Sequence, residues 1–193
     1  MKKPKFRSVK LLSANQFLLF TCTVIMLSIP FSSGAEAISD TPNGQKTVVK
    51  FMESLARYVT WPGSSFDGAD SPYKYCLMGE AAISGLLSEK LGAKKVKKRG
   101  FEIKQLALDD IEQGKSCHLV FIAATDVPTL RNTISALSDS AVLTTGDFKQ
   151  FAGHGGMVGF VGVGGKGSLQ INKKRLEASG LKASSKLYRV STL

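Results

Sequence analysis

The glycine-rich stretch at residues 153–167 constrains the fold of this 193-residue chain more than any other feature. Small and apolar residues alternate over residues 153–161, a second glycine cluster follows, and residues 168–172 are again strand-like. This order predicts a buried strand that reverses into a neighbouring strand. We expect the glycines to allow positive φ angles at the turns and a close approach of the backbones.

Residues 162–167 also match the letters G-x-G-x-x-G of the dinucleotide-binding motif. That motif needs glycines that follow a strand, open a helix and lead to an acidic residue further on. Here a strand-like run follows the glycines instead. A Walker loop fails as well, because Phe160 stands where its first glycine should be. We therefore interpret the stretch as a hairpin turn and expect no nucleotide cofactor.

The first 37 residues have the order of a secretory signal peptide. Basic residues between positions 2 and 10 precede an almost wholly apolar run at residues 17–29, and Ala35-Glu36-Ala37 offers a cleavage site before Ile38. The apolar run is shorter than the roughly 20 residues of a comfortable transmembrane helix, although an uncleaved anchor is the alternative. Cys22 lacks the small preceding residues of a lipoprotein site. We predict a soluble exported domain of residues 38–193.

The predicted mature chain, residues 38–193, has an excess of basic residues. Residues 1–37 hold five of the 26 Lys and Arg residues and one of the 15 Asp and Glu residues, which leaves 21 basic and 14 acidic residues, a formal net charge of +7. Much of the excess lies at residues 94–99, Lys-Lys-Val-Lys-Lys-Arg. We interpret that run as a solvated turn at a strand edge, with a contact to acidic lipid headgroups or an acidic protein as the alternative. Nucleic-acid binding is disfavoured, because no aromatic residues alternate with these charges.

Two cysteines follow the predicted cleavage site, Cys76 and Cys117. In an oxidising compartment such an even pair is expected to form a disulfide. Closing a loop of about 40 residues would stabilise the fold by roughly 4 kcal/mol. A redox-active or zinc-binding pair that uses His118 is the alternative, but the chain has no C-x-x-C motif and too few ligands.

Periodicity predicts the remaining elements. Val48, Met52, Leu55 and Val59 recur at helical spacing, and Trp61-Pro62 ends that helix. We interpret Trp61 as a core residue, with a ligand platform as the alternative. Strands are predicted at residues 73–78, 100–108, 118–124 and 141–145, and helices at residues 81–91, 109–114, 126–137, 147–151 and 173–178. Residues 183–190 stay unassigned. This alternation predicts an α/β fold of one domain, with helices around a mostly parallel sheet that the final hairpin makes mixed.

Candidate catalytic groups are few. The two histidines, His118 and His154, are interpreted as a buried structural residue and a turn residue. The sequence contains no G-x-S-x-G or H-E-x-x-H motif. Asp109, Asp110 and Asp147 fall at predicted helix starts, where carboxylates favour the helix dipole. We therefore expect no enzyme activity, no cofactor and no metal.

Several segments resemble a known family in order and spacing. They are residues 50–62 (KFMESLARYVTWP), 75–79 (YCLMG), 117–122 (CHLVFI), 142–147 (VLTTGD) and 155–161 (GGMVGFV), with Ile171-Asn172 and residues 184–187 closing the series. In these segments the sequence is similar to the YfiR family of periplasmic proteins, over nearly the whole chain after residue 37. Cys76 and Cys117 match the structural disulfide of that family. This chain lacks the second cysteine pair of some members, and residues 94–99 replace a shorter polar stretch.

The resemblance implies a periplasmic protein that binds the periplasmic part of an inner-membrane diguanylate cyclase and holds the enzyme inactive, which lowers cyclic di-GMP and biofilm formation. Such an inhibitor must bind one conformation of its partner better than the other. Aromatic residues and arginines that the core leaves free are the candidate contacts. They are Arg57, Tyr58, Trp61, Phe148, Phe151, Arg175 and Arg189. The competing hypotheses are a small-molecule sensor or carrier and an envelope enzyme, and a homodimer is also open.

Overall fold

The structure is a computed structural model that describes residues 37–163, 166–189 and 191–192. The predicted signal peptide ends where this description begins, so its apolar run and Glu36 lie outside the described residues. The described residues belong to one compact unit. None of the helices in these ranges is long and apolar enough to cross a membrane.

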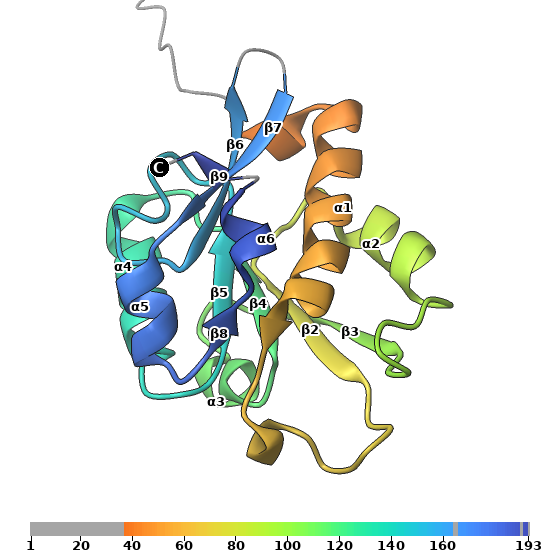
Figure 1. The fold of residues 1–193 in the computed structure, drawn as a ribbon. Helices are drawn as coiled ribbons and strands as arrows, with labels where there is room; N and C mark the ends of the chain where they lie inside the picture. The colour runs from red at the N-terminus through yellow and green to blue at the C-terminus, as the bar shows by residue number, and fades with distance from the viewer. Residues whose placement is uncertain (1–36, 164–165, 190, 193) are drawn as a thin grey trace, which may run out of the picture. The chain divides into compact units, whose positions relative to one another are not determined.

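The central feature is a mixed sheet with the strand order β3-β2-β4-β5-β6-β7-β9 (Figure 1). Its strands are β2 (Tyr73–Met78), β3 (Phe101–Leu106), β4 (Leu119–Ile122), β5 (Leu143–Gly146), β6 (Val158–Val163), β7 (Lys166–Ile171) and β9 (Ser191–Thr192). The strands from β3 to β6 pair in parallel, β6 and β7 pair antiparallel, and β7 and β9 pair in parallel. The predicted α/β class and the mostly parallel mixed sheet are confirmed.

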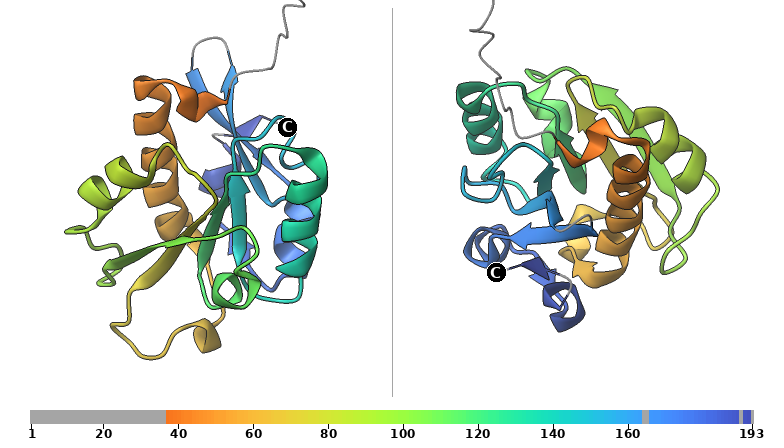
Figure 2. Two further views of the ribbon diagram at one scale, coloured as in Figure 1. Left: turned by 180° about the vertical axis from the view of Figure 1, so that it is seen from behind. Right: turned by 90° about the horizontal axis from the view of Figure 1, so that it is seen from above.

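Helices cover both faces of this sheet (Figure 2). The long helix α1 (Pro42–Tyr58) and α2 (Ser84–Leu91) pack on one face, against Tyr75 and Leu77 of β2. On the other face α3 (Ile111–Lys115) and α4 (Val127–Ala136) pack near Cys76 and Met78 of the same strand. Alternate residues of β2 thus pack into two cores, which is why residues 75–78 of this strand are all apolar.

Helix α1 begins six residues before the apolar stripe that predicted it. Pro42 occupies its first turn, and the Thr41 side chain accepts a hydrogen bond from the Gly44 N–H. Both features favour a helix start, because proline needs no N–H bond there and the cap satisfies a free donor. At the other end of the helix, the Tyr73 and Tyr75 hydroxyls donate to the Ala56 and Met52 carbonyls.

The C-terminal part of the chain returns to α1. Strand β1 (Val59–Thr60) directly follows α1 and pairs antiparallel with β8 (Lys182–Ala183). Helix α5 (Lys173–Ala178) precedes β8, and helix α6 (Ser185–Tyr188) follows it. Residues 183–190, which the sequence left unassigned, therefore include the end of β8 and α6. Short 3-10 helices at Ile38–Asp40 and Gly63–Ser65 complete the described elements.

The glycine-rich region forms the predicted hairpin of β6 and β7, and its tip residues 164 and 165 lie outside the described residues. Strand β6 ends at Val163 and β7 begins at Lys166, so the described residues on either side of this gap are strands. At Gly167 a β-carbon would lie 2.2 Å from the methyl group of Thr47 on α1. Close packing of α1 on the hairpin therefore requires this glycine.

The helix predicted at residues 147–151 is wrong. Residues 149–155 form consecutive turns with Gln150 at φ 55°, and the Phe151 side chain is fully buried. A β-carbon on Gly156 would lie 2.0 Å from that ring, and one on Gly146 would lie 2.6 Å from it. The two glycines therefore form walls around Phe151, and burial of its ring outweighs the local helical pattern. Asp147 does not begin a helix; its carboxylate accepts a hydrogen bond from the Ser39 N–H.

Candidate functional site

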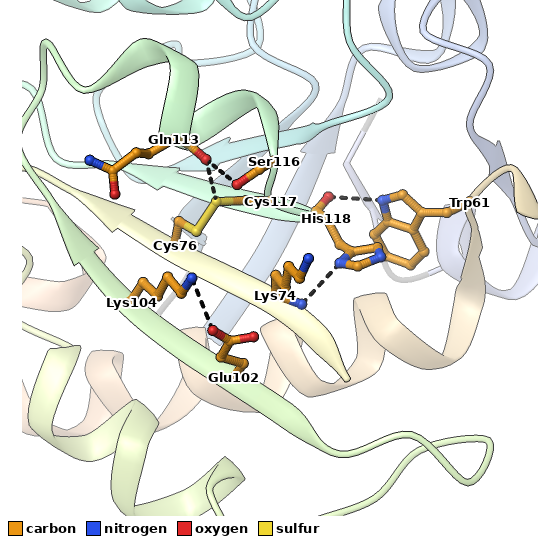
Figure 3. Close-up of a disulfide and its surroundings, with 9 residues drawn as sticks. All are labelled: Trp61, Lys74, Cys76, Glu102, Lys104, Gln113, Ser116, Cys117 and His118. Atoms are coloured by element: carbon orange, nitrogen blue, oxygen red, sulfur yellow. Dashed lines mark hydrogen bonds and ion pairs between the residues drawn. A yellow bond between two sulfur atoms is a disulfide. The ribbon is translucent and has the colours of Figure 1, made fainter. Parts of the chain in front are cut away.

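His118 lies inside an aromatic cluster at the amino-terminal end of β4. Its ring stacks on Phe66 with centroids 4.3 Å apart, and the rings of Trp61 and Tyr73 meet it edge-on. The Trp61 Nε1–H donates to the His118 carbonyl at 2.8 Å (Figure 3). Trp61 is only 5% exposed, so it is the core residue that the sequence predicted.

The imidazole of His118 is held in its neutral form. Its Nδ1 accepts a hydrogen bond from the Lys74 backbone N–H at 2.9 Å, which places the ring proton on Nε2. Nε2 is buried without a partner within hydrogen-bond geometry in the described residues, although the nearby Ser65 carbonyl favours the charged ring. Burial dominates and lowers the pKa of His118 to about 4. This histidine is therefore structural at neutral pH, as predicted.

The structure contains the Cys76–Cys117 disulfide beside this cluster (Figure 3). The two Cα atoms are 6.1 Å apart, and the bond joins the middle of β2 to the chain just before β4. Both cysteines are buried, so a reductant or a metal reaches the sulfur atoms only when the fold opens. In the part of the chain that the structure describes, no group of three or more His, Cys, Asp or Glu side chains could hold a metal ion.

A shallow crevice of about 460 Å³ lies at the carboxyl ends of β2, β3 and β4. The chain passes from β2 outward to β3 and then returns to β4 on the other side of β2, which makes this the switch point of the sheet. Ligands of open α/β sheets bind at such points. Small and apolar groups line most of the crevice, and Glu80 provides its charge. The Gln105 side chain donates to the Gly79 carbonyl across it.

The seven predicted partner contacts divide into three groups. Trp61 and Phe151 are 5% and 0% exposed, so the expectation that they present a surface to a partner is corrected: the core uses both rings. Phe148 is half-buried and packs on the α4 face, where its ring lies 5.9 Å from that of His154.

The other four contacts lie on neighbouring elements, at the end of α1, on α5 and directly after α6. They are Arg57, Tyr58, Arg175 and Arg189, which we call the α1/α6 surface. Strand β1 pairs with β8, α1 contacts α6, and α5 contacts β8, so α5 is joined to α1 through the β1–β8 pair. Arg57 and Arg189 are exposed, and Tyr58 and Arg175 are half-buried.

A groove between α1 and α2 escaped the sequence analysis. It has a volume of about 220 Å³ and an apolar floor of Val49 and Leu86. Lys46, Lys50, Lys90 and Lys94 frame it. The sequence did contain one sign of this groove: Lys46 and Lys50 are four residues apart and therefore lie on the same face of α1.

Comparisons with known proteins agree with the fold. A family model described as YfiR/HmsC-like matches residues 45–192. No curated protein matches the chain significantly. A crystal structure of a conserved domain protein from Vibrio cholerae O1 biovar El Tor is similar at a TM-score of 0.50 and 14% identity. That match covers 75% of this chain and 59% of the crystallised chain, so the likeness concerns the fold alone.

Proposed function

The chain belongs to the YfiR/HmsC-like family, and we propose that it is a periplasmic inhibitory binding protein that restrains an inner-membrane diguanylate cyclase. The observation that carries this proposal is the family match over residues 45–192, which spans both faces of the sheet and every described helix from α2 onward. The signal-peptide pattern of residues 1–37 supports export. By lowering cyclase activity, the protein would lower cyclic di-GMP and biofilm formation.

The chemistry of the described residues supports a binding role. His118 is buried and neutral, Cys76 and Cys117 are bonded to each other, and no metal-binding group is found in the described ranges. An inhibitor needs none of these groups for catalysis. It shifts its partner toward the inactive state by the difference between its affinities for the two states.

We assign the partner contact to the α1/α6 surface. Arginine and tyrosine dominate the energy of many protein interfaces, and here three arginines and a tyrosine lie on packed neighbouring elements. Arg57 is 55% exposed in its side chain and makes one surface ion pair with Glu53 at 3.3 Å. Its loss would cost the fold only about 0.3–0.5 kcal/mol, so the residue can be tested without unfolding the protein.

The test is inhibition of a cyclase in inner-membrane vesicles that expose their periplasmic side and are loaded with GTP, so that the enclosed catalytic domain has its substrate. Residues 38–193 should lower the synthesis of cyclic di-GMP, and the double substitution Arg57→Ala and Arg189→Ala should weaken inhibition by at least tenfold in concentration. Arg131→Ala is the matched control, because Arg131 is exposed on α4 at the opposite face. If the unsubstituted protein left the cyclase activity unchanged, the proposed inhibitory function would be refuted. Equal inhibition by the double variant would refute only the assigned surface.

The crevice at the switch point favours a second candidate, a periplasmic sensor or carrier of a small molecule. Such a protein should melt at a higher temperature when a metabolite is added without any partner. Ala123→Leu would place a larger side chain in the crevice and should remove that shift. A metabolite that stabilises the substituted protein equally would bind elsewhere.

A further inference from the structure

Seven exposed lysines lie on α1, on α2 and in the loop that follows α2. They are Lys46, Lys50, Lys90, Lys94, Lys95, Lys97 and Lys98, which we call the basic surface. Four of them frame the apolar groove between the two helices. Lys94 pairs with Glu53 and Lys90 with Glu89, whereas the other five form no ion pair within the described ranges. Seven lysines less the two glutamates, Glu53 of the groove and Glu89, leave the region a formal net charge of +5.

The structure holds the tip of this surface firmly in place. Val96 and Arg99 exchange backbone hydrogen bonds of 2.9 and 3.0 Å across a tight turn. Val96 is 5% exposed and anchors the turn in the core. The Arg99 guanidinium lies 3.8 Å above the Phe66 ring and donates to the Gly68 and Ser71 carbonyls. Arg99 is thus committed to the fold, while Lys97 and Lys98 face solvent.

Backbone conformation at the turn makes its lysines unusual. Lys97 and Lys98 have φ angles of 51° and 72°. Two successive residues with positive φ are the places where asparagine and glycine are normally found, because a β-carbon is strained there. Lysine gives no conformational advantage at either position. Charge is therefore the property that explains these two residues.

The composition of the basic surface favours a membrane over a protein as its partner. Its cations are lysines, whose flexible stems and point charges suit a mobile array of phosphate headgroups. An acidic protein is better recognised by the fixed fork of arginine and by aromatic residues that fill pockets. Two arginines adjoin the surface. Arg99 is engaged inside the chain, and Arg57 pairs with Glu53, which also pairs with Lys94. The seven residues of the surface are all lysines and include no aromatic residue.

We propose that the basic surface docks this protein onto a bilayer that contains anionic phospholipids. Anionic lipid attracts each nearby lysine strongly enough to change partitioning by about fivefold, and this attraction falls off within a Debye length. The bound state is reversible and sensitive to salt. The inference goes beyond the proposed inhibition, because vesicles without any protein are sufficient to test it.

The experiment is co-sedimentation of residues 38–193 with vesicles of phosphatidylcholine containing about one quarter phosphatidylglycerol. Binding should be strong in about 0.01 M salt, where the Debye length is about 30 Å, and should vanish in about 1 M salt, where it is about 3 Å. Pure phosphatidylcholine vesicles should retain almost none of the protein. The triple substitution Lys95→Gln, Lys97→Gln and Lys98→Gln should weaken binding by on the order of 100-fold.

A second triple variant provides the control for net charge. Lys174→Gln, Lys182→Gln and Lys186→Gln also removes three exposed lysines, from α5, β8 and α6. It should bind nearly as well as the unsubstituted protein, and melting curves should show that both variants fold. Equal losses in the two variants would overturn the assigned surface. If the protein bound soluble polyglutamate but not anionic vesicles, the proposed docking to a membrane would be refuted, and the partner of the basic surface would be an acidic protein.

Discussion

His118 makes the stability of this fold depend on pH. The unfolded chain protonates a histidine near pH 6.5, whereas burial lowers the pKa of His118 to about 4 in the folded chain. Between these two values the unfolded chain binds a proton that the folded chain does not. The free energy of unfolding is therefore fully retained above pH 6.5 and decreases as the pH falls toward 4, by up to about 3 kcal/mol.

The substitution His118→Asn tests this dependence. Its amide oxygen can accept the Lys74 N–H, and the side chain does not titrate. Urea unfolding at about pH 7 and about pH 4.5 should show a loss for the unsubstituted protein that exceeds the loss for the variant by about 2–3 kcal/mol. Equal losses would mean that carboxylates alone account for the acid sensitivity.

The glycines around Phe151 are required by close packing rather than by their φ angles. Gly156→Ala would put a methyl group 2.0 Å from the Phe151 ring, so we expect a decrease of about 1–3 kcal/mol in the free energy of unfolding. Gly85→Ala is the control, because Gly85 lies in α2 with nothing within 4 Å of a β-carbon. That helix substitution should raise the free energy by about 0.5–1 kcal/mol. If Gly156→Ala left the free energy of unfolding unchanged, the turn segment would be able to move away from the added methyl group.

Individual residues show where sequence reasoning succeeds and where it stops. Trp61 is the only tryptophan of the chain and follows an amphipathic helix, and the usual burial of tryptophan was enough to predict a core position. Phe151 has the same chemistry, but Gly146 and Gly156 reach its ring from other parts of the fold. The sequence shows that glycines are present and does not show which ring they contact.

At the scale of elements, the disulfide is the strongest single constraint on the sheet. It joins β2 to the start of β4 across 41 residues, a segment that includes α2, β3 and α3. The substitution of both cysteines by alanine should lower the free energy of unfolding by about 2–4 kcal/mol, because the unfolded chain gains the entropy of an open loop. Urea unfolding of the double variant, with and without reductant, measures this value. A reductant should destabilise the original protein and leave the variant unchanged; a response of both would point to an effect outside this bond.

The boundaries of the elements follow local chemistry where caps are present. Asp126 caps α4 through a hydrogen bond from the Thr129 N–H, and Pro128 lies in the first turn, so this helix was predicted within two residues. Residues 147–151 also begin with an acidic residue and carry two phenylalanines three apart. There the carboxylate of Asp147 bonds to Ser39, which is 108 positions away. A contact so distant in sequence leaves no periodic signal.

For the whole molecule, the layers were predictable and the return of the C-terminus was not. Buried strands that alternate with helices predict a parallel sheet covered on both faces. The pairing of β1 with β8 involves two residues on each strand, and β9 pairs with β7 over two residues. Pairings of that length give no alternation that a sequence reading can detect. The α1/α6 surface depends on them, so the proposed site could only be assembled from the structure.

These short pairings predict that stability is uneven across the molecule. Amides in β4 and β5, which lie between other strands in the buried core, should exchange hydrogen only on global unfolding. Amides at residues 182–192 should exchange through local openings that need much less free energy. Native-state hydrogen exchange read by mass spectrometry, with increasing denaturant, separates the two classes. If the free energy of opening depended on denaturant in the same way in both regions, the C-terminal elements would open only together with the sheet.

The Cys76–Cys117 bond also determines what a peptidase does to this protein. Residues 76–117 form a covalent ring, and the turn at residues 96–99 presents two exposed lysines of that ring, Lys97 and Lys98. Such loop tips are preferred places for proteolytic cleavage, and trypsin-like enzymes cut after lysine. One cut after Lys97 or Lys98 opens the ring without releasing a fragment, because the disulfide still connects the two pieces. Strand β3, which follows the cut, also stays paired with β2 over six positions. The nicked protein therefore remains one molecule even under denaturing conditions, until a reducing agent breaks the disulfide and separates its two pieces.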